Sequence, residues 1–165
     1  MQGMYRAADG GAELKGWDMK KLRSIYEVLD FAIAGEINAH ELYTKMSAMV
    51  ENPWMCRTIE GFAQEELQHR AKLEAVKAGK IALEREEVGD LGIADTLEDI
   101  KPHASMDYRE LLVFAIKKED VSHSLYTTMA SIFSEPELKA LFRKLAEEEA
   151  DHKRRFEIEY DLMKF

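Results

Sequence analysis

The chain has 165 residues and carries 23 basic against 32 acidic side chains, a formal net charge of -9. This length suits one domain that buries roughly 70% of its unfolded surface, and the acidity argues against nucleic acid as a partner. A single cysteine, Cys56, excludes an intramolecular disulfide and any Cys-x-x-Cys motif. No stretch approaches roughly 18 consecutive apolar residues, and acidic residues interrupt the first 20 positions, where a secretory signal needs an apolar run. We therefore expect a cytoplasmic protein with no membrane segment.

Residues 1–18 contain four glycines and show no helical periodicity, so they are predicted to form a flexible arm. In residues 19–165, apolar side chains recur at intervals of three and four, which is typical of helices that pack in a bundle. The predicted helices cover about 19–50, 53–77, 108–133 and 136–163. Asn52 is predicted to cap the second helix, because it precedes a proline, which is favoured at the first helical position.

The segment 78–106 is far longer than the turn that a helical hairpin needs. About 28 extended residues, at about 3.3 Å each, can run back along a helix of about 26 residues, which is about 39 Å long. The segment is therefore predicted to be a crossover, after which the third helix starts at the same end as the second. The expected fold is all-α, with two helical hairpins joined by this crossover in a single domain.

The two halves of the chain repeat each other at a separation of 83 residues. Between 31–76 and 114–159, 15 of 46 aligned positions are identical, where unrelated sequences of this composition would give about three. Two amphipathic hairpins rich in Glu and Leu could share apolar positions by chance. That explanation does not account for the matched histidines, so the pattern indicates a duplicated unit.

Polar residues interrupt the apolar stripe of every predicted helix at mid-length. They are one glutamate in the first and third helices and a Glu-x-x-His pair in the second and fourth: Glu36, Glu66, His69, Glu119, Glu149 and His152. Residues three apart share a helix face, so each pair can present an oxygen and a nitrogen inward. Four ionised carboxylates would repel one another in a low-dielectric core, whereas two divalent cations would neutralise them. We predict that these six residues bind two metal ions. One nitrogen per ion among several oxygens suits iron and manganese and suits zinc less well.

Neighbouring polar residues allow more than one interpretation. Tyr43 and Tyr126 lie two turns beyond Glu36 and Glu119, where a phenol could hydrogen-bond a carboxylate or simply fill the core. His40 and His123 could support the metal ligands, act as ligands or be core histidines with other partners. Two further glutamates, Glu65 and Glu148, precede the paired glutamates and are expected to face solvent; a register error of one residue would make them the ligands.

The pattern Glu-x6-Tyr followed by Glu-x-x-His, present twice, resembles the rubrerythrin branch of the ferritin-like superfamily. Ferritin-like bundles hold two iron or manganese ions with one glutamate from each of two helices and a Glu-x-x-His pair from each of the others. The resemblance implies a ferritin-like four-helix bundle, two iron ions, the six ligands above, and reduction of peroxide or dioxygen with oxidation of ferrous iron.

The sequence departs from standard rubrerythrins at two points. They carry an extra glutamate three residues after the third-helix ligand, where this chain has Ser122. They also carry a rubredoxin-like domain with paired Cys-x-x-Cys motifs, and this sequence, with a single cysteine, contains no such motif. A peroxidase or oxidase of this kind would therefore need an external electron donor. A homodimer is expected. Two alternatives stay open: iron oxidation and storage, and a non-catalytic metal-binding bundle that serves as a sensor or interaction module.

Overall fold

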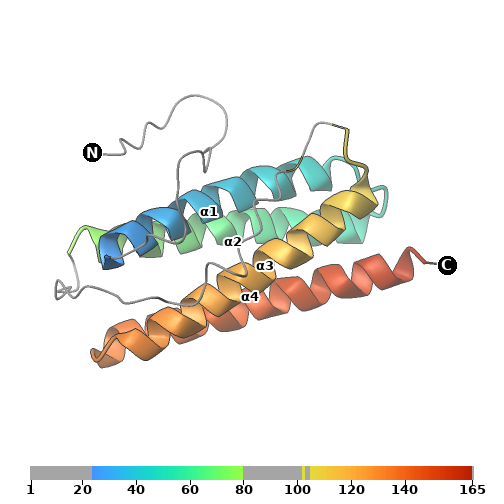
Figure 1. The fold of residues 1–165 in the computed structure, drawn as a ribbon. Helices are drawn as coiled ribbons and strands as arrows, with labels where there is room; N and C mark the ends of the chain where they lie inside the picture. Colours follow the sequence, from blue (N-terminus) through green and yellow to red (C-terminus); the bar gives the residue numbers. More distant parts are fainter. Residues whose placement is uncertain (1–23, 80–101, 103–104, 165) are drawn as a thin grey trace. The chain divides into compact units, whose positions relative to one another are not determined.

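The computed structural model describes residues 24–79, 102 and 105–164. Within these ranges the chain forms four α-helices and no strand, as predicted (Figure 1). They are α1 (Ile25–Ser47), α2 (Pro53–Lys77), α3 (Tyr108–Ile132) and α4 (Pro136–Leu162). The helices form two compact units, one built on α1 and α2 and the other on α3 and α4. The predicted arm at 1–18 and nearly all of the predicted crossover at 78–106 lie outside the described residues.

Helices α1 and α2 form a hairpin, drawn in blue to green in Figure 1. The hydroxyl of Ser24 accepts a hydrogen bond from the Glu27 N–H at 3.1 Å and caps α1. Asn52 caps α2 as predicted, since its side-chain oxygen accepts from the N–H groups of Trp54 at 2.9 Å and Met55 at 3.3 Å. These bonds satisfy helix N–H groups that have no partner within the helix.

The second hairpin consists of α3 and α4. Asp107 and Glu110 form a reciprocal capping box at the start of α3, with both side-chain to backbone hydrogen bonds at 2.8 Å. At the turn between the helices, the rings of Phe133 and Phe142 stack with centroids 5.3 Å apart. Lys153 of α4 pairs with Asp120 of α3 at 2.7 Å. Caps, aromatic packing and charge thus fix the ends and middle of this hairpin.

The predicted helix boundaries agree with the structure within one residue except at α1. This helix starts at Ile25, after the extended cap residue Ser24, whereas a start at about residue 19 was expected. The helix ends at Ser47, three residues before Val50, where the apolar periodicity was expected to end. Val50 continues the apolar spacing but lies in the short connection that leads to the Asn52 cap. In the described parts of the chain, no helix combines the length and apolar character needed to cross a membrane.

Candidate metal centre

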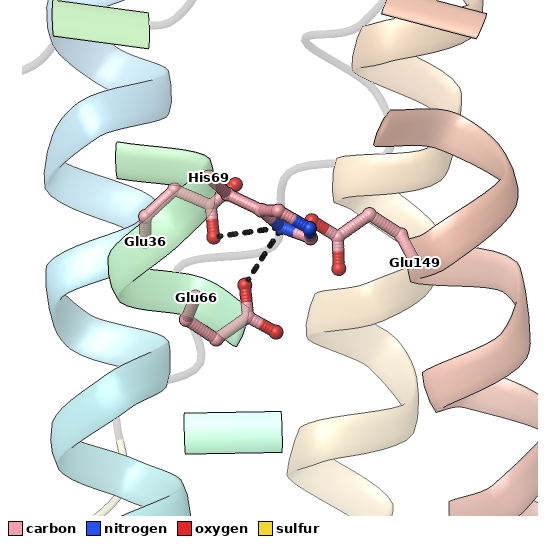
Figure 2. Close-up of side chains that lie close together, drawn as sticks. All are labelled: Glu36, Glu66, His69 and Glu149. Atoms are coloured by element: carbon pink, nitrogen blue, oxygen red, sulfur yellow. Dashed lines mark ion pairs between the residues drawn. The ribbon is translucent and has the colours of Figure 1, made fainter. Parts of the chain in front are cut away.

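The first hairpin brings three of the predicted ligands together. Glu36 comes from α1, and Glu66 and His69 come from adjacent turns of α2 (Figure 2). The His69 Nδ1 atom lies 3.3 Å from a Glu66 carboxylate oxygen and 3.9 Å from a Glu36 carboxylate oxygen. Each side chain offers one ligand atom within 4.8 Å of the others. All three residues are at most 2% exposed. We call them the α1–α2 triad.

The second hairpin repeats this arrangement with Glu119 from α3 and with Glu149 and His152 from α4. The His152 Nδ1 atom lies 3.5 Å from a carboxylate oxygen of each glutamate. The three ligand atoms again lie within 4.8 Å of one another, and each residue is 1% exposed. These residues form the α3–α4 triad. The structure therefore places all six predicted ligands in two equivalent clusters, one in each hairpin.

Burial changes the acid-base chemistry of the α3–α4 triad. Loss of solvation, followed by the nearby Glu149 carboxylate, raises the pKa of Glu119 from 4.5 to about 8, although His152 acts in the opposite direction. A carboxyl group with this pKa holds a proton near neutral pH unless a cation takes the place of the proton. The triad is therefore poised to exchange a proton for a metal ion.

The donor set of each triad fits one divalent cation. Two glutamates provide two negative charges, and a neutral imidazole adds a nitrogen ligand. The charges balance within each triad, which matters because a buried net charge is costly. Oxygen-rich sites with one imidazole are typical of iron and manganese. Both triads thus contain buried carboxylate and histidine groups that could bind metal.

The two tyrosines near the triads are fully buried. Tyr43 is 0% and Tyr126 is 1% exposed. The ring of Tyr126 packs against Phe142 with centroids 6.0 Å apart, a contact that suits the interpretation of the tyrosines as aromatic core residues. Donation from either phenol to a triad carboxylate stays a prediction.

His40 and His123 have partners on the neighbouring helix of their own hairpin. The Nδ1 atom of His40 lies 2.8 Å from the Ala63 carbonyl oxygen, and that of His123 lies 2.8 Å from the Ala146 carbonyl oxygen. A carbonyl only accepts, so each Nδ1 carries the proton and donates it. These bonds link α1 to α2 and α3 to α4. These contacts fit the interpretation of His40 and His123 as core histidines with other partners.

The two glutamates that precede the paired ligands are more exposed than those ligands. Glu65 and Glu148 are half-buried, whereas Glu66 and Glu149 are buried. Glu148 pairs with Lys144 at 3.4 Å on the outer side of α4. The predicted register of both Glu-x-x-His pairs therefore agrees with the burial of the side chains.

The fold and the two buried triads define an all-helical protein with carboxylate and histidine groups that could bind metal. The family model described as Rubrerythrin matches residues 27–92 and 110–164, which is more than half of the chain. The chain therefore belongs to the rubrerythrin family.

A solved structure supports the same fold. The chain is similar to a hypothetical protein, Pfu-1136390-001, from Pyrococcus furiosus, with 24% sequence identity and a TM-score of 0.65 over 83% of this chain and 88% of that chain. No curated protein matches the sequence. The family and the structural similarity confirm the predicted fold class, an all-α ferritin-like four-helix bundle.

Proposed function

We propose that this protein is a rubrerythrin-like oxidoreductase that reduces hydrogen peroxide or dioxygen while ferrous iron is oxidised. The observation that carries the proposal is the buried Glu, Glu and His triad in each hairpin of a rubrerythrin-family chain. Each triad would hold one iron ion. When bound, two ferrous ions would supply two electrons, which with two protons reduce one peroxide molecule to two water molecules or one dioxygen molecule to hydrogen peroxide.

The protein's own residues would perform three tasks. Glu36, Glu66 and His69 hold the metal of the first hairpin, and their burial limits access of bulk water. In the second hairpin, Glu119 gives up its proton on metal binding, because the cation stabilises the ionised carboxylate. The hydrogen bonds from His40 and His123 tie together the helices that carry the ligands. The single cysteine, Cys56, cannot form a four-cysteine iron site, so we propose that an external donor returns the electrons.

Anaerobic loading with two ferrous ions per chain, followed by stopped-flow mixing with peroxide or dioxygen, tests this function. We expect fast consumption of the oxidant together with oxidation of iron. Glu66→Ala and Glu149→Ala should abolish the fast phase, whereas Glu148→Ala, a half-buried neighbour, should retain it. Equal rates in the wild type and the Glu66→Ala variant would refute the proposal.

The same experiment separates the two alternative functions. Iron oxidation that continues far beyond two ions per chain, in a large multi-subunit shell, would favour iron storage. We propose a homodimer instead, which size-exclusion chromatography would detect. Tightly held metal that reacts with neither oxidant would favour a non-catalytic sensor or interaction module.

A further inference from the structure

An open groove of about 520 Å³ lies between α3 and α4 and involves no residue of either triad. Its volume is within the range of about 300–1,000 Å³ that is usual for small-molecule sites. We call it the α3–α4 groove. Its polar lining residues are His123, Thr127, Ser131, Lys139, Arg143 and Glu147.

Two cations in the α3–α4 groove lack a carboxylate partner within the described part of the chain. The Lys139 ammonium donates to the Ala130 carbonyl oxygen at 3.1 Å, which holds it at the groove and leaves two of its N–H groups for other acceptors. Arg143 forms no ion pair among the described residues and offers a planar set of five N–H donors. Two such cations at one cavity contrast with the net charge of -9 on the whole chain. The two cations outnumber the single carboxylate that lines the groove, Glu147, so the groove has an excess of positive charge that an anion would offset.

The other polar groups in the groove are mainly acceptors. The hydroxyl of Thr127 donates to the His123 carbonyl at 2.8 Å, and that of Ser131 donates to the Thr128 carbonyl at 2.6 Å. Their oxygen lone pairs can still accept hydrogen bonds, as can the Glu147 carboxylate. The groove therefore suits a ligand that has an anionic group at one end and a hydrogen-bond donor, such as a hydroxyl, at the other.

We propose that the α3–α4 groove binds a small molecule through a phosphate or carboxylate group held by Lys139 and Arg143. Arginine and lysine form charge-assisted hydrogen bonds with both kinds of oxyanion, and arginine can bind two oxygens at once. Hydroxyl groups on the same molecule would donate to Glu147 and to the Thr127 oxygen.

The internal repeat shows that a hairpin of the same design, α1–α2, forms without cations at these positions. At the equivalent positions of α2 the chain has Cys56 and Glu60 in place of Lys139 and Arg143. The histidine bond between the helices is retained in both hairpins at 2.8 Å. The cations therefore add a local property to the second hairpin, and glutamate at position 143 should be compatible with the fold.

Calorimetric titration of the full chain at low ionic strength, with inorganic phosphate and separately with malate, tests the proposal. We expect Arg143→Glu to weaken binding by about tenfold or more and Lys139→Ala by a smaller factor, because charge-assisted hydrogen bonds are lost. Arg154→Glu is the matched control, because it makes the same charge change on the exposed side of α4, where Arg154 pairs with Asp151. It should leave binding unchanged, and circular dichroism should show equal helix content in all variants.

Binding of phosphate or malate that is weakened by Arg143→Glu, but not by Arg154→Glu, supports the groove and identifies the preferred oxyanion. Binding of neither probe by the wild type, or equal weakening by both arginine variants, overturns the proposal. Because neither cation belongs to a triad, this result does not depend on whether the metal centre is active.

Discussion

The two hairpins resemble each other closely inside and much less outside. Leu29 of α1 and Leu112 of α3 are equivalent, and both are 0% exposed. The two triads also match residue for residue. By contrast, the outer faces of α2 and α4 differ in charge, since Glu60 of α2 is the repeat equivalent of Arg143 in α4. Packing and ligand geometry limit change at buried positions, while an exposed face can change its charge without loss of the fold.

On the proposed function, removal of the imidazole from one triad at a time has the largest expected effect. We expect His69→Ala and His152→Ala each to lower bound iron from two ions to about one per chain. Each variant should reduce peroxide consumption by more than about 100-fold, since even residues that only support metal ligands contribute about 10–100-fold. Metal analysis and stopped-flow absorbance measure the two effects. Loss of both ions in one variant but not in the other would show that the triads are not equivalent.

A buried leucine tests whether the two cores contribute equally to stability. Leu29→Ala and Leu112→Ala should each lower the free energy of unfolding by about 2–5 kcal/mol, because each creates a cavity at a fully buried position. Urea denaturation followed by circular dichroism gives the values. Similar losses would extend the equivalence of the hairpins to their energetics. A second transition, seen in one variant only, would instead show that the hairpins unfold separately.

The raised pKa of Glu119 predicts how the metal-free protein responds to pH. Between pH 4.5 and about 8 this residue is ionised in the unfolded chain but protonated in the folded one. Folding then takes up a proton, so the free energy of unfolding falls as pH rises through this window. Denaturation at several pH values measures the slope, and Glu119→Gln should make it flatter. Metal binding should have the opposite dependence and strengthen with pH, because the cation displaces the proton.

The same substitution at Glu36 compares the hairpins. If Glu36→Gln flattens the pH dependence as much as Glu119→Gln does, the two triads share one acid-base behaviour. An unchanged slope in the Glu119→Gln variant would contradict the assignment of this pH dependence to Glu119.

Much of the fold was predictable because local chemistry marks the helix ends. The Asn52 cap and the proline after it define the start of α2, and Gly79, with a φ of 77°, follows its end. The predicted end of α1 at Val50 was wrong, since apolar spacing alone does not show where a helix stops. Periodicity also favoured Glu66 over Glu65, because Glu66 falls in the apolar stripe of α2 and Glu65 lies beside it.

The hydrogen-bond partners of His40 and His123 and the α3–α4 groove could not be predicted in this way. His40 and His123 donate to backbone carbonyls, which every residue possesses and which therefore leave no pattern in the sequence. Lys139 is half-buried and Arg143 is exposed, on a helix that carries many other charged residues, so neither stands out in the sequence. The one available signal was the repeat itself, in which these two positions differ in charge from their counterparts.

The smallest expected effect concerns the helix caps that follow each hairpin turn. Asn52 and Glu135 are equivalent in the repeat, but only Asn52 makes side-chain hydrogen bonds to its helix. Asn52→Ala should therefore lower the free energy of unfolding by about 1 kcal/mol, whereas Glu135→Ala should change it little. Glu135→Asn should raise stability by a few tenths to about 1 kcal/mol, because it supplies the missing acceptor to the first turn of α4. Urea denaturation of the three variants measures these differences. Equal losses in both alanine variants would show that the turn, and not the cap hydrogen bonds, determines the stability contributed by these positions.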